Sequence, residues 1–373
     1  MLAALIALSV QQPTFANVYQ KADRGYTQIR IPSLVTGLHG MLLAFAEGRN
    51  TDKSDQGSNK ILLRRSRDNG KTWFPIQVLD DQGASSLNNP CAVVDRPSGR
   101  IFLFYQRVPA GLSEGSPKLQ PGYGKDTFAC FVISSRDEGM TWTAPRDITR
   151  SVKRPEGATT ICSGPGIGIQ LTRDPHVGRL VVPFNEGPFY EWNNYAVFSD
   201  DHGATWRWGA NVPGAFVANT EGERRSEVNE VQMAELSDGS VMLNSRQFAG
   251  AKVRKSAISH DGGETWSPIQ DVPALNDPSC MGSLFRYSFG PGRRNVLLYS
   301  GPNSASDRVN GTLHASFDDG VTWPVNRVLV PGKFAYSVLT RLPNGDLGCL
   351  FETDDYQKIT FARVPLPWLL GSH

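Results

Sequence analysis

The 373-residue sequence lacks several features that would assign it to common functional classes. Its formal net charge is only +2 and it has no long basic run, so nucleic-acid binding has little support. The five cysteines are scattered, without a CxxC pair or a Cys/His cluster, so no zinc site is indicated. Long amphipathic helical patterns are missing, and β-branched and aromatic residues dominate the apolar runs. The sequence therefore predicts an all-β protein with buried free thiols, one disulfide being the alternative.

Long hydrophobic runs are also scarce. Residues 2–10 form a short apolar run, and Thr-Phe-Ala follows at residues 14–16. This pattern predicts a signal peptide over residues 1–16 and hence an exported protein, either secreted or periplasmic. The run is too short to span a bilayer and has no basic residues before it, so the alternative is a strand or helix packed on the fold. Residues 17–373 are expected to form a single domain, without a transmembrane segment.

One octet recurs five times with Ser, Asp, Gly, Thr and Trp at fixed offsets. It occupies residues 66–73, 135–142, 199–206, 259–266 and 316–323. The Asp carboxylate can accept hydrogen bonds from nearby backbone N–H groups, and Gly supplies a positive φ without a steric cost. The Trp offers a large apolar side chain for packing. Each octet therefore predicts a hairpin turn with a buried Trp, and five equivalent aspartates cannot all serve one active site.

The spacing of the octets sets the expected architecture. Their aspartates are 69, 64, 60 and 57 residues apart, which leaves room for about four short strands and their turns in each unit. A chain of this length holds about six such units. We therefore predict a six-bladed β-propeller, whose last blade is closed by pairing the N-terminal strand region with the C-terminal one.

Four features stand outside the repeats. Arg30 lies within an apolar strand, where it needs either an anion to bind or a structural salt bridge. Glu230 and Arg246 are placed to face each other on adjacent strands, as a site or as an ordinary ion pair. Arg308 precedes the last octet, where a surface turn is the alternative. Tyr336 precedes a strand, and such a residue is often simply packed in a core or at a rim.

Together, these features resemble the exo-α-sialidase (neuraminidase) family over nearly the whole chain, in family order. Ile-Arg-Ile-Pro at residues 29–32 resembles the family's RIP motif, and the octets resemble its Asp-boxes. The resemblance implies that Arg30, Arg246 and Arg308 form a triad that clamps the substrate carboxylate. It implies that Tyr336 is the nucleophile and Glu230 its partner.

The resemblance also assigns residues around this centre. Asp55 falls at the acid/base position, Glu352 at that of a Glu bracing the first triad Arg, and Arg49 at that of an arginine near the sugar's distal hydroxyl. Some bacterial members have an Asp near the position of Asn89, and that Asp contacts the same distal hydroxyl. If Asn89 takes its place here, a neutral hydrogen bond replaces a charged one. For the N-acetyl group an apolar pocket is expected, and its candidates are Phe184, Tyr190 and Trp192, for which core packing is the alternative.

These residue types suit the chemistry of sialic acid, which carries a carboxylate on its anomeric carbon. Three guanidiniums hold that anion through charge and planar geometry. A carboxylate nucleophile would be repelled by it, whereas a neutral Tyr hydroxyl is not, and sialidases are known exceptions among glycosidases in this respect. A phenol is a weak nucleophile, so it needs a base such as Glu230.

The sequence therefore predicts a retaining exo-α-sialidase that hydrolyses terminal α-linked sialic acids from glycans, glycoproteins or glycolipids through a glycosyl-tyrosine. This mechanism needs no cofactor or catalytic metal. The first alternative is a non-catalytic Asp-box propeller that binds protein or glycan. The second is a trans-sialidase or a related glycosidase for another acidic sugar, with acceptor choice in loops such as residues 108–125.

Overall fold

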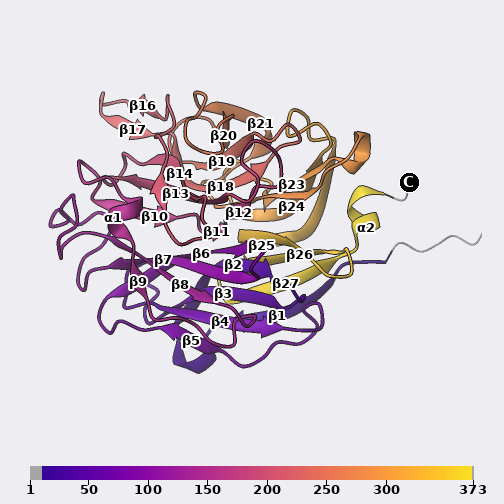
Figure 1. Ribbon diagram of the computed structural model, residues 1–373, viewed down its shortest axis with the longest axis horizontal. Coiled ribbons are helices and arrows are strands. Elements are labelled where there is room, and N and C mark those ends of the chain that lie inside the picture. Colours follow the sequence, from indigo (N-terminus) through magenta and orange to yellow (C-terminus); the bar gives the residue numbers. More distant parts are fainter. Residues whose placement is uncertain (1–10, 372–373) are drawn as a thin grey trace, which may run out of the picture.

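The computed structural model describes residues 11–371, which form an all-β structure (Figure 1). Helical segments in this part of the chain are short: α1 (Thr149–Val152), α2 (Leu366–Leu370) and single 3-10 turns at Asp23–Gly25 and Gly292–Arg294. Most of the predicted signal peptide lies outside the described residues. Residues 14–16 are described, and they belong to the first strand.

The strands form antiparallel meanders that follow one another along the chain. The first sheet has the order β2 (Gln28–Thr36), β3 (Leu42–Arg49), β4 (Lys60–Ser66) and β5 (Gln77–Asp80). The second has β6 (Ser86–Asp95), β7 (Arg100–Val108), β8 (Ala129–Ser135) and β9 (Arg146–Asp147), and β11 (Gly166–Ile167) is parallel to β6. The third has β10 (Thr160–Ser163), β13 (Leu180–Gly187), β14 (Asn193–Ser199) and β15 (Arg207–Trp208), and β12 (Ile169–Gln170) also pairs with β13.

The remaining strands continue this pattern. A small hairpin of β16 (Phe216–Ala218) and β17 (Arg224–Ser226) precedes a sheet of β18 (Val228–Glu235), β19 (Val241–Gln247), β20 (Val253–Ser259) and β21 (Gln270–Asn276). The last sheet has the order β22 (Ser283–Ser288), β23 (Val296–Pro302), β24 (Val309–Ser316), β25 (Val325–Arg341), β26 (Leu347–Thr353), β27 (Lys358–Val364) and β1 (Thr14–Gln20).

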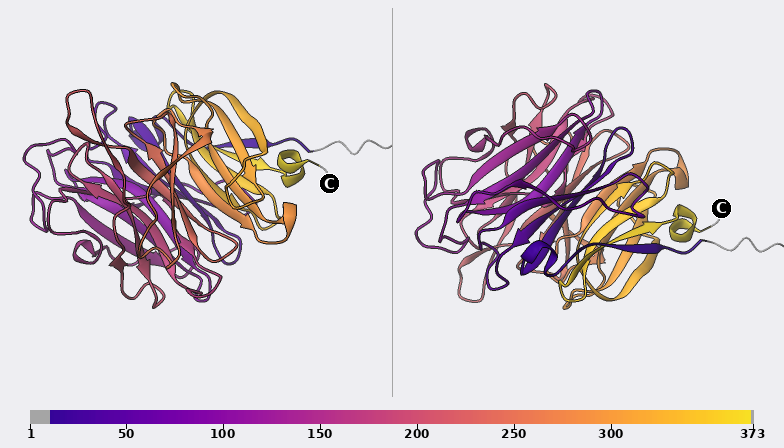
Figure 2. Two further views of the ribbon diagram at one scale, coloured as in Figure 1. Left: turned by 90° about the horizontal axis from the view of Figure 1, so that it is seen from above. Right: turned by 90° about the horizontal axis from the view of Figure 1, so that it is seen from below.

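The long strand β25 belongs to two meanders. Its first half pairs with β24 and its second half, from Phe334 onward, pairs with β26. At the end of the sheet β1 pairs antiparallel with β27, so the N-terminal strand completes the C-terminal meander as predicted. Figure 2 shows this indigo strand running beside the yellow C-terminal strands. The pairing includes residues 14–16, which cleavage after Ala16 would remove from β1.

The five octets share one hydrogen-bond pattern. In the first, the Ser66 hydroxyl donates to Asp68 at 2.8 Å, and the Asp68 carboxylate accepts from the backbone N–H and the hydroxyl of Thr72 at 2.9 and 2.6 Å. The N–H of Gly70 donates to the Ser66 hydroxyl, and Gly70 has a φ of +76°. Trp73 then packs edge-on against Phe361 of β27, so this turn fastens the first sheet to the last.

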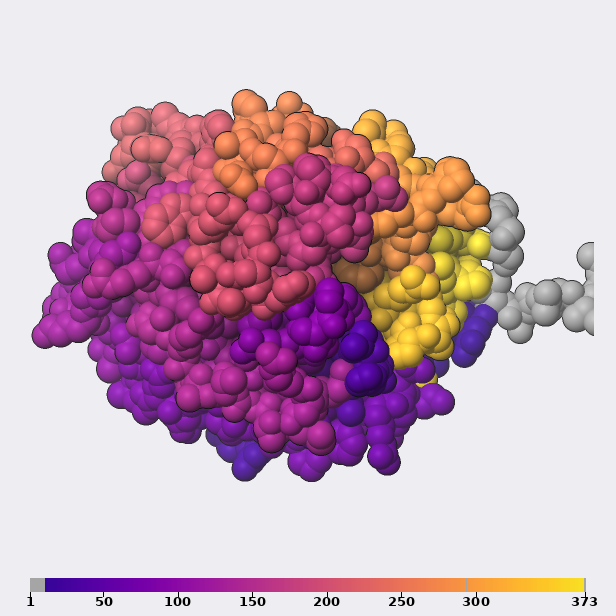
Figure 3. Space-filling model, viewed as in Figure 1, coloured from indigo at the N-terminus to yellow at the C-terminus, as the bar shows by residue number. Residues whose placement is uncertain are grey.

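The core runs between neighbouring sheets. Every residue of β3, β8 and β13 is buried, and each of these strands begins with a run of apolar residues. Figure 3 shows one face of the molecule, built from segments that span the whole chain, with a hollow near its middle where these segments meet.

Candidate active site

Seven of the eight predicted site residues line one open cavity of about 430 Å³. They come from β2, β3, β18, β19 and β25 and from the segments that follow β3 and precede β24. These seven are Arg30, Arg49, Asp55, Glu230, Arg246, Arg308 and Tyr336. The eighth, Glu352 on β26, is fully buried behind Arg30.

The RIP motif forms a bulge in β2. The pairing register with β3 shifts between Arg30 and Ser33, and Ile31 has a φ of +59°, which a β-branched residue rarely adopts. Pro32 donates no hydrogen bond and therefore fits the interrupted ladder. Two contacts hold the bulge, because Glu352 accepts from the N–H of Ile31 at 2.8 Å and from the guanidinium of Arg30 at 2.9 Å through both oxygens. Strain at a bulge that presents a charged side chain is typical of functional sites.

Tyr336, Glu230 and Arg246 form a compact hydrogen-bonded cluster. The Tyr336 hydroxyl lies 2.6 Å from both carboxylate oxygens of Glu230, and Arg246 Nη1 lies 2.7 Å from Glu230 Oε2 and 2.9 Å from the Tyr336 hydroxyl. Burial and the charge of Glu230 raise the pKa of Tyr336 well above its ordinary value, and Arg246 and Arg308 offset only part of this. Tyr336 is therefore a protonated phenol that donates a hydrogen bond to the Glu230 carboxylate.

The three predicted triad arginines have unequal partners. Arg30 is paired with Glu352, and Arg246 with Glu230. In the part of the chain that the structure describes, Arg308 has only neutral hydrogen-bond partners: its Nη2 donates to the Ser279 carbonyl at 2.7 Å and its Nη1 to the Tyr356 hydroxyl at 3.1 Å. Arg246 Nε is buried and has no hydrogen-bond partner within residues 11–371. The three guanidiniums converge, and their positive charge is only partly neutralised by Glu352 and Glu230. They therefore favour the binding of an anion between them.

A second charged cluster surrounds Arg49. Its guanidinium contacts Glu47 at 2.8 Å and Asp55 at 2.5 Å. Glu47 is fully buried and also accepts from the N–H of Asn89 at 2.7 Å and the amide of Asn88 at 3.2 Å. Asn89 has a φ of +56° and lines the same cavity.

Asp55 is the most exposed member of the site, with 68% of its side chain accessible. Desolvation in the cavity would raise the pKa of its carboxyl, but the charge of Arg49 and its hydrogen bond lower it, with smaller contributions from Arg30 and Arg246. Asp55 is therefore an accessible carboxylate that its contact with Arg49 keeps ionised.

Sequence reasoning missed Glu114, which enters the cavity from the loop between β7 and β8. Its carboxylate accepts from Trp192 Nε1 at 2.7 Å. Burial raises the pKa of Glu114 to about 7, the hydrogen bond from Trp192 opposes this, and the charge of Glu230 adds to it. No motif marks Glu114, and the sequence analysis named its loop, residues 108–125, only as a place for acceptor choice.

An aromatic wall adjoins Glu114. The rings of Trp192 and Phe248 have centroids 4.8 Å apart, and those of Tyr190 and Phe248 are stacked at 5.6 Å. Tyr190 has a φ of +72° and is 38% exposed. Of the three candidates for an apolar pocket, Tyr190 and Trp192 line the cavity, whereas Phe184 is a fully buried core residue packed against Phe104.

Several general features complete the description. All five cysteines are free, four of them buried, and no disulfide is present. Within the described residues, no group of three or more His, Cys, Asp or Glu side chains is placed to hold a metal ion. None of the helices in residues 11–371 is long and apolar enough to cross a membrane.

The sequence and the structure are similar to those of known proteins of one class. Residues 40–349 match the family described as the BNR repeat-like domain. The chain is 37% identical over 362 residues to the sialidase of Micromonospora viridifaciens, an alignment that covers 93% of this chain and 53% of that protein. It is 31% identical to sialidase-2 of Rattus norvegicus, covering 94% of this chain and 96% of that protein. The solved structure of the Hadza microbial sialidase Hz136 superposes with a TM-score of 0.83 at 28% identity, over 95% of this chain and 69% of that one.

The chain thus belongs to the sialidase family and has the β-propeller fold of its structural relatives. It spans about half the length of the Micromonospora relative, 53%, and nearly all of the rat one.

Proposed function

We propose that this protein is an exo-α-sialidase that hydrolyses terminal α-linked sialic acids from glycans, glycoproteins or glycolipids. The observation that carries the proposal is the contact of the Tyr336 hydroxyl with Glu230 and Arg246 inside a cavity where three arginines converge. The hydrogen bond to Glu230 activates the Tyr336 phenol as a nucleophile, and the three arginines beside it form a carboxylate-binding site. Family membership supports the same substrate class.

The fold that carries this site is proposed to be a six-bladed propeller with five Asp-box turns. The strand order supports it, because the seven-stranded sheet divides at β25 into two meanders and the other four large sheets supply one meander each. The short β16–β17 hairpin is then an insertion between two blades. An exported location stays a prediction from the N-terminal sequence.

The proposed reaction has two displacements. Arg30, Arg246 and Arg308 bind the substrate carboxylate, and the Tyr336 oxygen attacks the anomeric carbon while Glu230 takes the phenolic proton. Asp55, protonated once substrate has displaced it from Arg49, gives its proton to the leaving glycosidic oxygen. Water then attacks the glycosyl-tyrosine and gives a proton to Asp55, while Glu230 returns a proton to the departing Tyr336 oxygen. Two inversions give net retention.

The remaining residues have supporting roles in this proposal. Glu352 fixes the Arg30 guanidinium through two hydrogen bonds and offsets its charge, and its own pKa is lowered because Arg30 outweighs the effect of burial. Arg49, held by Glu47, is placed to bind a distal hydroxyl of the sugar.

Release of the fluorophore from a fluorogenic sialic-acid glycoside tests the activity directly. Rapid release, with the α-anomer of free sialic acid as the first product in NMR spectra, is the expected result. No release would favour a non-catalytic propeller that binds glycans. A sialylated sugar as the main product, when an acceptor such as lactose is added, would favour trans-sialidase activity over hydrolysis.

A further inference from the structure

A second cavity, of about 270 Å³, lies at the opposite ends of the strands that carry the candidate active site. Four strands line both cavities, and in each a residue at the second cavity comes five or six positions after a residue at the active-site cavity. These pairs are Arg30 and Thr36 on β2, Asn88 and Val94 on β6, Glu230 and Glu235 on β18, and Tyr336 and Arg341 on β25. At about 3.3 Å per residue, the two cavities are separated by roughly 16–20 Å.

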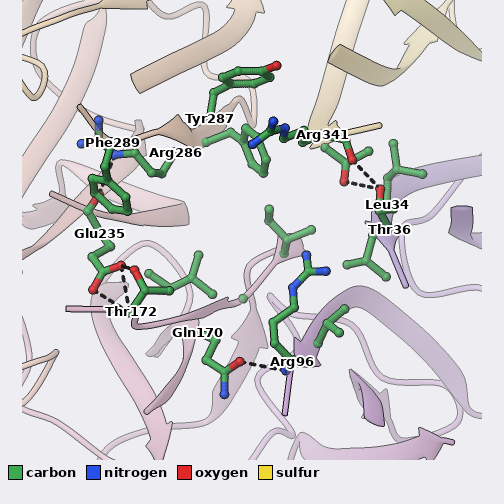
Figure 4. A pocket seen from close by; sticks show the side chains of 17 residues that line it. Leu34, Thr36, Arg96, Gln170, Thr172, Glu235, Arg286, Tyr287, Phe289 and Arg341 are labelled. Atoms are coloured by element: carbon green, nitrogen blue, oxygen red, sulfur yellow. Dashed lines mark hydrogen bonds between the residues drawn. The ribbon is translucent and has the colours of Figure 1, made fainter. Parts of the chain in front are cut away.

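The walls of the second cavity are largely apolar and aromatic. Ile167 and Ile169 line one part, and Phe285, Tyr287 and Phe289 line another. The aromatic rings are held in place, since Tyr287 donates a hydrogen bond to the Gly345 carbonyl and Phe289 lies under the Arg286 guanidinium at 5.0 Å. Figure 4 shows Phe289 and Arg286 on one side of the cavity and Leu34 and Thr36 across from them. A planar apolar group therefore finds rigid surfaces here.

Two arginines at this cavity lack a carboxylate partner. Within the described residues, no Asp or Glu oxygen lies within ion-pair distance of the guanidinium of Arg96 or Arg341, whereas that of Arg286 contacts Asp319 at 2.5 Å. Figure 4 shows Arg96 extending from its backbone into the space between the walls, with Arg341 beside Tyr287. The Arg341 guanidinium lies 4.9 Å from the centre of the Tyr287 ring.

The acidic groups nearby are already occupied. Glu235 accepts from the backbone N–H groups of Thr172 and Arg173 and from the Thr172 hydroxyl, at 2.6 to 3.0 Å. Glu138, the acidic residue that acts electrostatically on Arg96, accepts from the backbone N–H groups of His39 and Met41. The cavity therefore offers, beside an apolar wall, two guanidiniums that have no direct carboxylate contact within the described residues.

We propose that this cavity is a second ligand site, which binds a small organic carboxylate with a planar apolar body. The carboxylate lies between Arg96 and Arg341, where planar guanidiniums can donate paired hydrogen bonds, and the apolar body contacts Phe285 and Ile167. The volume limits the ligand to the size of a single aromatic ring with a short substituent. The site is separate from the Tyr336 centre and does not depend on the proposed sialidase activity.

The test is a ligand-observed NMR titration of the whole chain with benzoate. Because the candidate active site also binds carboxylates, every measurement is made in an Arg308→Ala background, which weakens that site without leaving a carboxylate unpaired. In this background, Arg96→Met with Arg341→Met is compared with Arg67→Met, a substitution at an exposed arginine that does not line the cavity. The neutral isostere benzamide is titrated in parallel.

The expected result is saturable benzoate binding in the background variant, weakened at least about ten-fold by the Arg96→Met and Arg341→Met pair and less than about two-fold by Arg67→Met. Benzamide is expected to bind at least about ten-fold more weakly than benzoate. No saturable binding of benzoate, equal affinity in the double-substituted protein, or equal affinity for benzamide would each overturn the assignment.

Discussion

The Tyr336 hydroxyl lies 2.6 Å from each carboxylate oxygen of Glu230, although the two residues are 106 positions apart in the chain. A donor shared between two acceptors in a buried site marks Glu230 as the group that receives the proton when Tyr336 acts as a nucleophile. The raised pKa of Tyr336 makes this partner necessary, because the free phenol would not ionise near neutral pH.

Replacing Tyr336 by Phe is therefore expected to lower kcat/KM for a fluorogenic sialoside by at least about 10³-fold, since no oxygen remains to attack. Glu230→Gln keeps the shape but removes the base, and a loss of about 10²–10⁴-fold is expected. Circular dichroism and thermal melting check that both variants stay folded. Turnover of Tyr336→Phe within ten-fold of wild type would sink the nucleophile assignment.

Arg308 is the triad arginine whose hydrogen-bond partners are all neutral, so its charge is available to a bound anion. Arg308→Lys keeps one positive charge but loses the planar fork. We expect kcat/KM to fall by about 10²-fold, measured as initial rates over a range of sialoside concentrations.

Arg327→Lys provides a matched control, because Arg327 is exposed, stacks on Trp368 and does not line the cavity. Its kinetics should equal those of wild type. An equal fall in both variants would point to a general effect of the substitution and against a role for Arg308 in binding the substrate carboxylate.

The proposed role of Asp55 predicts a dependence on the leaving group. Asp55→Asn removes a proton donor but leaves Tyr336 and Glu230 untouched. Glycosides with an acidic phenol as leaving group need little protonation, so their hydrolysis should fall far less than that of a sialylated sugar, by about 10²-fold in relative kcat/KM. Equal losses on the two substrates would instead make Asp55 a partner that only positions Arg49.

Much of this site follows from the sequence because each key residue lies in a recognisable local pattern. Arg30 lies in an apolar strand with Pro two residues later, and each Asp-box octet marks the turn between the third and fourth strands of a meander. Glu230 and Arg246 were expected to face each other on adjacent strands, and the resemblance to sialidases implied that Glu352 braces Arg30. The structure places both pairs in contact.

The rest depends on packing that no local pattern records. Glu114 reaches the cavity through a loop whose course is set by contacts such as that with Trp192, and its neighbours in sequence show no periodicity. Phe184 was a candidate for the apolar pocket with core packing as the alternative, and it lies in the core, fully buried on β13. The direction in which the pKa of Tyr336 shifts could not be predicted from the sequence either. It depends on the balance in the folded site, where burial and the charge of Glu230 raise the pKa more than the arginines lower it.

Glu114 gives a prediction for the pH dependence of stability. Its pKa is raised from 4.5 to about 7, so the folded protein holds a proton that the unfolded chain releases above pH 4.5. Stability contributed by this proton is complete below pH 4.5 and is lost as the pH rises to about 7. The amide of Glu114→Gln does not titrate, so its free energy of unfolding lacks this loss. Between pH 4.5 and 7 the variant should therefore gain stability relative to wild type, by on the order of 1 kcal/mol given the partial exposure of the loop. Urea unfolding at pH 4.5, 6 and 7.5 measures the difference, and a constant offset between the two proteins would contradict it.

The last prediction compares the stability cost of alanine at two glycines with a positive φ, one tightly packed in an octet turn and one in open space. Gly70 and Gly83 both have a positive φ, +76° and +62°. A Cβ on Gly70 would lie 2.1 Å from Phe361 Cε1, a fully buried ring, whereas a Cβ on Gly83 meets nothing within 4 Å. Gly83→Ala should therefore cost about 1–2 kcal/mol from backbone strain alone, and Gly70→Ala a further 1–3 kcal/mol because the ring of Phe361 must move. Urea unfolding of both variants measures these losses, and similar values for the two would show that the first octet turn is not fastened to β27 through Phe361.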